Sequence, residues 1–319
     1  RGPDRTTGYT ALQSAQGCSS GVFSGLLAKR TKRASPKTAL VHYVAPTVWA
    51  WKPWRARKVA KYLDRIMALF PFEPPYFERE GLACDFVGHP LLERVDRLPD
   101  GAGVALRAEL GIKPTATVLL VAPGSRSSEI ERLAKPFGDA AVLTSAAHIF
   151  EQVPDLEVVV PVATSVAAKV LDPGEMLFEE AEARKFAAFD AADIALAASG
   201  TVTLELAAMR VPMVVGYKMP KLTEFAIRRL VKVKTGTLVN IITGEQVVPE
   251  YWQDDCNGDT LSEALCELIS DGTARAAQVA GFDRALSQLG EGEISPSLRA
   301  ARSVLAALDD KRQRLSTAT

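Results

Sequence analysis

The sequence predicts an α/β protein built from parallel sheets, and three observations support this fold class. Apolar runs too short to be helices recur along the chain. Segments whose apolar residues have helical spacing separate these runs. Between residues 98 and 103, a stretch rich in Pro, Asp and Gly interrupts the series and marks a candidate linker. Short buried strands that alternate with helices are typical of βαβ units, which form parallel sheets.

The elements can be placed in order from these patterns. The expected strands are Ala39–Val44, Ile66–Phe70, Asp85–Val87, Val118–Ala122, Val158–Val162, Ile194–Ala198 and Met213–Val215. The expected helices among them are Trp54–Leu63, Val104–Leu110, Glu129–Phe137, Ser165–Leu171, Leu204–Met209 and Leu222–Val231. From Thr260 to about Arg314 the pattern is almost entirely helical, with a break at Gly290–Ser295.

Composition restricts the class of protein further. The 319 residues are 47% hydrophobic, and 38 basic residues balance 38 acidic ones, so global charge does not suggest nucleic acid as a partner. No apolar stretch reaches the roughly 18 residues of a membrane-spanning helix. The four cysteines lack paired spacing, which favours a reducing cytosol and no structural metal. We therefore expect a soluble intracellular protein.

Residues 1–37 differ from the rest of the chain. They carry seven basic residues and one acid, Asp4, and show neither a helical nor a strand period. Three interpretations compete: a disordered basic tail, an organelle transit peptide, and a damaged start to a longer reading frame. We expect the third, and we treat the segment as disordered or non-native.

The strand expected at Val118–Ala122 runs into a turn with the chemistry of a phosphate site. Pro123 and Gly124 end the strand, and Ser125 stands near the start of the next helix. Free backbone N–H groups and the positive end of a helix favour phosphate there. Arg126 adds a planar cation that can bind phosphate through two hydrogen bonds. The alternative is an ordinary capped helix in which Arg126 pairs with a nearby glutamate.

A second junction follows the strand expected at Ile194–Ala198. The small residues Ser199 and Gly200 allow close approach of the backbone, and Ser199 or Thr201 can cap the helix that follows. Glu205 lies four residues after Thr201, on the same helical face, where it could accept hydrogen bonds from a ribose diol. The alternative makes Glu205 a first-turn acid that complements the helix dipole. Two such loops in one domain favour a nucleotide site.

A tryptophan-rich segment precedes a run of basic residues. Trp49, Trp51 and Trp54 are followed by several arginines and lysines. This composition could stack nucleic-acid bases, lie at a lipid interface, line an acyl pocket, or form a core cluster beside a solvated helix. A second basic and apolar stretch, residues 218–234, makes an anionic membrane surface plausible.

From about His42 to Cys256 the chain resembles the lipid-A-disaccharide synthase family. The matching blocks, in chain order, are Tyr43–Trp51, Phe70–Glu73, Phe86–Pro90, Pro123–Arg126 with Glu129, Ser199–Thr201 with Glu205, Pro212–Tyr217, Leu238–Asn240 and Gln253. The resemblance implies a GT-B glycosyltransferase whose active site lies in a cleft between two Rossmann-like domains. It implies an N-terminal acceptor-side domain surviving at 38–103, a UDP-sugar domain at 104–283 and a helical tail at 284–319.

The implied reaction moves 2,3-diacylglucosamine from its UDP derivative to 2,3-diacylglucosamine 1-phosphate, with inversion. The products are UDP and the β-1,6-linked disaccharide 1-phosphate. Arg126 would stabilise the leaving pyrophosphate as the catalytic cation. The residues expected to bind the nucleotide and its phosphates are Gly124, Ser125, Ser199, Gly200, Thr201, Glu205, Gly216, Tyr217, Asn240 and Gln253. No cofactor or metal is expected.

The resemblance also implies a place in the cell. Family members act at the inner membrane of Gram-negative bacteria, so we expect a cytoplasmic, peripheral protein with a homodimer possible and no nucleic acid bound. Trp49, Trp51 and Trp54 are expected to contact acyl chains or the membrane.

The front of the chain departs from the family pattern. The Gly-rich first loop is absent, and so is the later Asp-rich motif that carries the favoured catalytic base. Two alternatives follow: an impaired chain that only binds UDP or the membrane, and a different GT-B enzyme of UDP-sugars, such as a 2-epimerase or a peptidoglycan glycosyltransferase.

Overall fold

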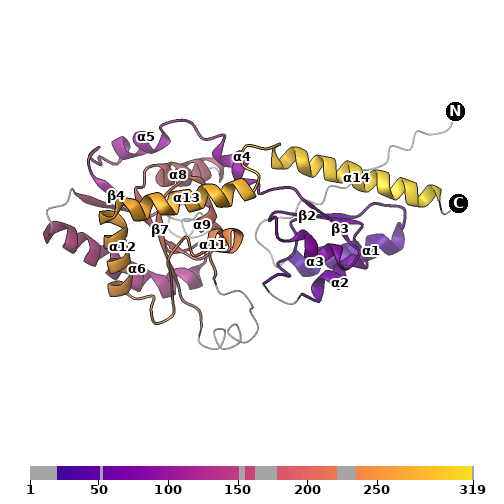
Figure 1. The fold of residues 1–319 in the computed structure, drawn as a ribbon, viewed down its shortest axis with the longest axis horizontal. Coiled ribbons are helices and arrows are strands. Elements are labelled where there is room, and N and C mark those ends of the chain that lie inside the picture. The colour runs from indigo at the N-terminus through magenta and orange to yellow at the C-terminus, as the bar shows by residue number, and fades with distance from the viewer. Residues whose placement is uncertain (1–19, 51–52, 151–154, 162–177, 221–234, 318–319) are drawn as a thin grey trace. The chain divides into compact units, whose positions relative to one another are not determined.

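The computed structural model describes residues 20–50, 53–150, 155–161, 178–220 and 235–317 (Figure 1). Its internal contacts divide the chain into two compact units. The first unit contains residues 1–67, 74–85 and 302–319, and the second contains residues 68–73 and 86–301. Neither unit is continuous in sequence, and the domain boundaries predicted above stay predictions.

The smaller sheet has three strands in the order β1, β2, β3. The strands are β1 (Val41–Tyr43), β2 (Arg65–Ala68) and β3 (Ala83–Phe86), and β1 pairs with β2 in parallel. The helices of this part are α1 (Ser20–Ala34), α2 (Arg55–Ala60) and α3 (Pro74–Glu78), with the second half of α14 (Pro296–Ser316).

Partly buried ion pairs hold α1 and α14 beside this sheet. The carboxylate of Asp64 accepts hydrogen bonds from Lys32 Nζ (2.9 Å) and Lys311 Nζ (3.0 Å). The guanidinium of Arg65 donates to Asp85 (2.5 Å) and Asp310 (2.7 Å). The hydrogen-bonded lysines hold the pKa of Asp64 below its usual range, although burial acts in the opposite direction. Each charge is therefore matched where it is withdrawn from water.

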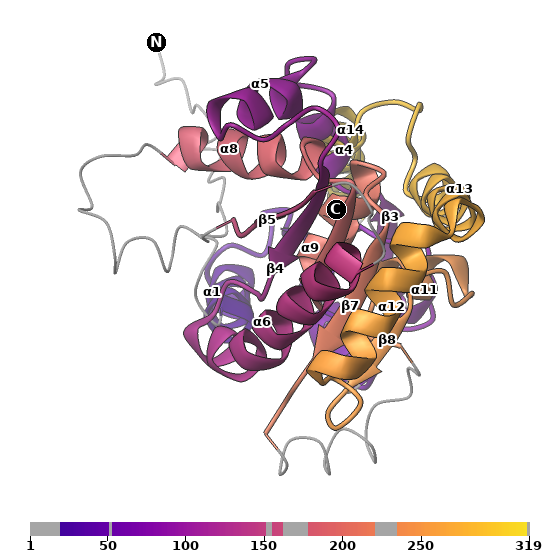
Figure 2. The same cartoon turned by 90° about the vertical axis from the view of Figure 1, so that its left-hand side faces the viewer.

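The second unit is built on a five-stranded sheet in the order β5, β4, β6, β7, β8, and every neighbouring pair is parallel (Figure 2). The strands are β4 (Thr117–Ala122), β5 (Leu156–Val159), β6 (Ile194–Ala198), β7 (Met213–Tyr217) and β8 (Glu250–Trp252). The helices are α4 (Leu91–Val95), α5 (Ala102–Glu109), α6 (Ser127–Phe150), α8 (Phe178–Asp190), α9 (Thr201–Ala208), α11 (Leu238–Thr243), α12 (Gly258–Ser270) and α13 (Gly272–Gln288).

Alternate residues of the central strands supply two cores, one on each face of this sheet. On one face, residues such as Leu120 and Ala197 pack with α5, α8, α9, α11 and α13. On the other face, residues such as Leu119 and Leu196 pack with α6 and α12 (Figure 2). Because both faces are covered, the strands read as continuous apolar runs, which is why the sequence predicted them.

The predicted fold class, α/β with parallel sheets in two Rossmann-like parts, is confirmed. All seven predicted strands are present within a few residues, and β6 has the predicted bounds. β8 was not predicted, because three residues carry too little pattern. The predicted helices Ser165–Leu171 and Leu222–Val231 lie outside the described residues.

The expectation for residues 1–37 was wrong in part, because residues 20–34 form the helix α1. This helix has no acidic residue in its first turn and a polar, basic second half, so the sequence showed no start signal. Its bond from Lys32 to Asp64 is a tertiary contact that no local pattern reveals.

The prediction of an almost entirely helical tail after Thr260, with a break at Gly290–Ser295, is confirmed, and the structure adds one further break at Asp271. The carboxylate of Asp271 accepts hydrogen bonds from the backbone N–H groups of Thr273 (2.7 Å) and Ala274 (3.2 Å), so it caps α13 and separates that helix from α12. Among the helices that the structure describes, none is long and apolar enough to span a bilayer.

Candidate functional site

The two predicted junctions leave the large sheet at the same edge. β4 and β6 are parallel neighbours, with Ala122 opposite Ala197. The turns that follow them, at Gly124 and at Ser199, therefore emerge side by side at the carboxyl ends of the strands. β7 and β8 end at this edge too, with Tyr217 opposite Trp252. In parallel sheets covered on both faces, ligands bind at this edge.

At the β4–α6 junction the backbone at position 124 requires glycine, and the guanidinium of Arg126 is exposed. Gly124 has a φ of +107°, and a Cβ atom there would lie 2.8 Å from Glu129 Oε2. The side chain of Arg126 is 78% exposed and donates to Glu129 Oε1 at 2.5 Å. The alternative in which Arg126 pairs with Glu129 is therefore realised, with the arginine side of the pair exposed to solvent and the Glu129 side chain only 14% exposed. The predicted contact of Arg126 with phosphate stays a prediction.

The β6–α9 junction is held by hydrogen bonds within the protein. The hydroxyl of Ser199 donates to the carbonyl oxygen of Gly236 at 3.0 Å. The helix α9 begins after Gly200 and has no side-chain cap, so the predicted capping by Ser199 or Thr201 was wrong. A ligand at this edge would meet the N–H groups of the first turn, which no side chain in the described part of the chain caps.

Glu205 is held by a lysine from the neighbouring helix. Its carboxylate lies 3.0 Å from Lys185 Nζ, and the Glu205 side chain is only 15% exposed. Lys185 also contacts Glu182 at 3.1 Å, and its Nζ lies 4.8 Å from the centre of the Phe186 ring. The carboxylate expected to bind ribose is thus already engaged with α8, and a ribose would have to share it with Lys185.

At the end of β7 the expected residues pack closely on the strands around them. A Cβ atom on Gly216 would lie 2.7 Å from a ring carbon of Phe137 and 2.9 Å from Cys256 Sγ, so only glycine fits. Burial raises the pKa of the Cys256 thiol to about 11 and keeps it protonated. The Tyr217 ring meets Trp252 edge-on, with centroids 5.4 Å apart.

The amides of Asn240 and Gln253 bond to the protein itself. Gln253 Oε1 accepts from the N–H of Met219 at 2.7 Å, and its Nε2 donates to the Met219 carbonyl at 3.2 Å. Asn240 is buried; its Oδ1 accepts from the N–H groups of Val247 and Val248, each at 2.9 Å. These residues shape the backbone of the site edge, and their predicted contacts with a ligand stay predictions.

Comparison with known proteins shows to which family this chain belongs. The family model described as lipid-A-disaccharide synthetase matches residues 17–303. The lipid-A-disaccharide synthase of Rhodospirillum centenum is 45% identical over 282 residues, covering 87% of this chain and 69% of the relative. The chain belongs to the lipid-A-disaccharide synthase family. The predicted resemblance is therefore confirmed, and the family is one of glycosyltransferases.

Other relatives agree with this assignment. The lipid-A-disaccharide synthase of Ruegeria pomeroyi is 45% identical over 299 residues, covering 89% of this chain and 71% of the relative. Among solved structures, the S. aureus MnaA–UDP co-structure is 14% identical with a TM-score of 0.46, covering 85% of this chain and 75% of that chain. A likeness of that size carries no argument about function. The family match begins within the segment that the sequence left unassigned.

The tryptophan-rich segment of this synthase family member is partly described. Trp49 is half-buried, and Trp54 is 52% exposed with Lys58 Nζ 4.2 Å from its ring centre. This distance is typical of a cation–π contact. Trp51 and most of the second basic stretch, 221–234, lie outside the described residues.

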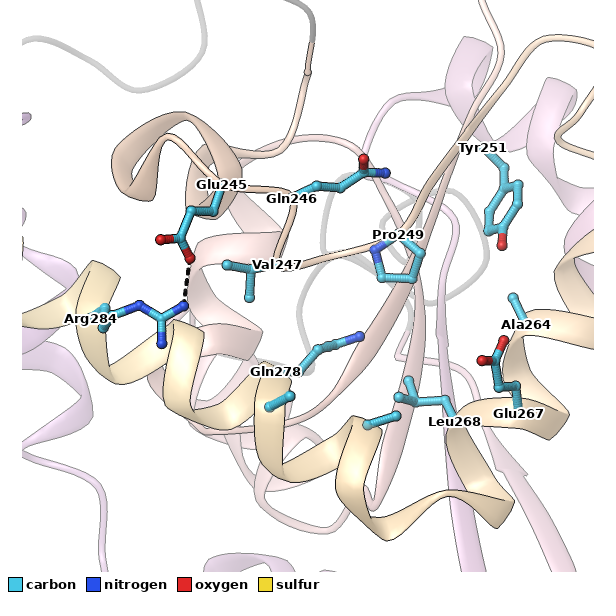
Figure 3. A pocket seen from close by; sticks show the side chains of 12 residues that line it. Glu245, Gln246, Val247, Pro249, Tyr251, Ala264, Glu267, Leu268, Gln278 and Arg284 are labelled. Atoms are coloured by element: carbon cyan, nitrogen blue, oxygen red, sulfur yellow. Dashed lines mark hydrogen bonds and ion pairs between the residues drawn. The ribbon is translucent and has the colours of Figure 1, made fainter.

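A shallow cavity of about 430 Å³ lies away from the residues named so far (Figure 3). Its lining includes Pro249 and Tyr251 of the β8 region, Glu245, and Gln278 and Arg284 of α13. Glu245 and Arg284 form an ion pair of 2.7 Å across its rim (Figure 3). None of the predicted site residues lines this cavity.

Sequence reasoning missed one residue that organises the site edge. Glu250 begins β8, and its side chain bonds to the segment 235–237 before α11. The sequence offers only a weak signal, a Thr-Gly-Thr turn before an apolar helix, and nothing that joins this turn to an acid several residues later.

Proposed function

We propose that this chain transfers 2,3-diacylglucosamine from its UDP derivative to 2,3-diacylglucosamine 1-phosphate. The products are UDP and the β-1,6-linked disaccharide 1-phosphate. The observation that carries the proposal is the family match over residues 17–303, with the matching turns at Gly124 and Ser199 on one edge of the sheet.

The second unit would hold the donor. The backbone N–H groups at the start of α9 and the exposed cation of Arg126 come from neighbouring strands, so a diphosphate could bridge them. Glu205, shared with Lys185, would accept hydrogen bonds from the ribose hydroxyls. Tyr217 and the segment held by Gln253 would border the nucleoside.

The reaction is a single displacement. The bond from the anomeric carbon to the UDP oxygen breaks while the acceptor hydroxyl oxygen forms its bond from the opposite face, which inverts the centre. Negative charge grows on the leaving diphosphate, and Arg126 with the α9 N–H groups would stabilise it. A base takes the proton of the acceptor hydroxyl as the new bond forms.

Two measurements test the proposal. Calorimetric titration of UDP into the full chain should give saturable binding. Release of UDP from the acylated donor, measured with and without the acylated acceptor, should depend on both lipids. Binding without release would leave the chain as a UDP-binding protein, whereas release from UDP-N-acetylglucosamine alone would favour another enzyme of UDP-sugars.

Membrane contact is proposed for the Trp54 region. Trp54 and the neighbouring basic face of α2, which carries Arg55, Arg57 and Lys58, combine an exposed indole with positive charge. Such a surface suits anionic lipid headgroups. Flotation with vesicles of phosphatidylglycerol and phosphatidylethanolamine should recover the protein, and Trp54→Ser should recover less. Equal recovery of the two proteins would contradict this contact.

A further inference from the structure

The carboxylate of Glu250 accepts hydrogen bonds from several donors of the segment 235–237, which lies beside the site edge at the carboxyl ends of the strands. Glu250 Oε2 accepts from the N–H of Gly236 (3.0 Å) and from Trp252 Nε1 (3.1 Å). Its Oε1 accepts from the N–H of Thr237 (2.9 Å), from Asn240 Nδ2 (3.0 Å) and from the Thr235 hydroxyl. In the described part of the chain these partners are neutral donors rather than lysine or arginine. Bonds to a charged acceptor are the stronger kind.

The segment that Glu250 holds is in direct contact with the β6–α9 junction. The carbonyl of Gly236 accepts the hydroxyl of Ser199 at 3.0 Å, while the N–H of the same residue donates to Glu250. A Cβ atom on Gly236 would lie 2.5 Å from the Trp252 indole and 3.0 Å from Ser199 Oγ. This glycine is therefore enclosed between Trp252, Glu250 and Ser199, with no room for a side chain at its position.

Alternation along β8 separates this arrangement from the cavity of Figure 3. Glu250 and Trp252 share one side of the strand, and Pro249 and Tyr251 share the other, where they line the cavity. The Glu250 carboxylate thus lies on the side of the sheet on which α9 and α11 pack. Its partners include both ends of the 235–237 segment, so its loss would release the segment from Ser199.

We propose that Glu250 is a positioning residue for the diphosphate of the donor. By fixing Gly236 and Trp252, it fixes the Ser199 hydroxyl and, through it, the turn whose N–H groups face the ligand. The inference rests on the proposed function, because it takes the Ser199 turn as the phosphate contact. Glu250 acts through Ser199 and does not itself touch the ligand.

The test is Glu250→Gln in the full chain, with UDP titrated by calorimetry. The amide keeps the shape but turns an N–H toward at least one donor, so we expect the Kd for UDP to rise about tenfold. Glu245→Gln is the matched control. It makes the same change five positions earlier, at an exposed ion pair with Arg284, and should leave the Kd within about twofold.

A double-mutant cycle separates positioning from mere structural support. If Glu250 acts through Ser199, adding Ser199→Ala to Glu250→Gln should weaken UDP binding far less than it does in the wild type. A carboxylate that only stabilises the fold would lower the unfolding temperature and leave the two effects on Kd additive. Additive effects, or an unchanged Kd in Glu250→Gln, would overturn the inference while leaving the proposed function intact.

Two milder variants test the same inference if Glu250→Gln fails to fold. Trp252→Phe and Thr235→Val each remove one donor to Glu250, and each should raise the Kd for UDP by about two- to fourfold. If both bind UDP as the wild type does, the inference is wrong. If the wild type binds no UDP at all, the proposed function fails and this inference fails with it.

Discussion

The two junctions at the site edge look alike in sequence and differ in how the protein holds them. At the β4–α6 junction, Arg126 is 78% exposed and its ion pair is with Glu129, three residues along the same helix start. At the β6–α9 junction, Ser199 is bonded to Gly236 across 37 residues, and Glu205 to Lys185 across 20. The β4–α6 junction therefore presents an exposed cation, Arg126, whereas the β6–α9 junction is pre-organised by bonds to distant parts of the chain.

If this edge binds the diphosphate of the donor, as proposed, the difference gives each junction a separate role. A pre-organised turn costs little to order when ligand binds, so it gives geometry. An exposed arginine costs side-chain entropy but can follow the charge as it shifts to the leaving group. Substitutions at the first junction should therefore change ligand affinity alone, and those at the second should also change stability.

Arg126→Ala should have the largest effect on UDP binding. Loss of a charge-assisted contact to phosphate is worth roughly 1.5–3 kcal/mol, so the Kd should rise about 10- to 100-fold by calorimetry. The unfolding free energy should stay within about 0.5 kcal/mol of wild type, because the Arg126 side chain is 78% exposed. A clear loss of stability would remove the contrast between the junctions.

Glu205→Ala should change both quantities. UDP affinity should fall about tenfold through loss of the ribose contact. Denaturant titration should show a loss of about 1 kcal/mol, because Lys185 would lose one of its two described ion pairs, and that pair is partly buried. Glu182→Gln is the control, since it leaves the Glu205 pair intact and should not alter UDP binding. Wild-type stability in Glu205→Ala would mean that the β6–α9 junction is no more pre-organised than the β4–α6 junction.

Ser199→Ala should have an intermediate effect on affinity. The substitution removes one neutral hydrogen bond, to the Gly236 carbonyl, worth about 0.5–1.5 kcal/mol. We expect the Kd for UDP to rise about two- to tenfold, with a small drop in unfolding temperature. An effect on Kd equal to that of Arg126→Ala would indicate that the hydroxyl bonds the phosphate directly.

Glu129→Gln should have the smallest effect and the opposite sign. The carboxylate of Glu129 competes with phosphate for Arg126, so its neutralisation should lower the Kd for UDP about twofold at low salt. The gain should fade as ionic strength rises, because exposed charges are screened. Weaker binding in this variant would show that Glu129 supports the turn at Gly124 rather than competing with the ligand.

The parts of the fold that the sequence predicted are those with a local signal. β6 was placed at Ile194–Ala198 because its residues are apolar throughout, as a strand covered on both faces must be. Arg126 and Ser199 were chosen as candidate site residues because each follows such a strand, and their roles stay predictions. β8 was not predicted, because its three residues become a strand only by pairing with β7.

The sequence by itself determined the family, the α/β class and the two loops at strand ends, since motifs and periodicity are properties of neighbouring residues. Only the tertiary structure decided which groups those loops bond. The pairing of Ser199 with Gly236, of Glu205 with Lys185, and of Glu250 with the 235–237 segment each joins different elements. Hydrogen bonds depend on distance in space, and chain spacing alone does not set that distance.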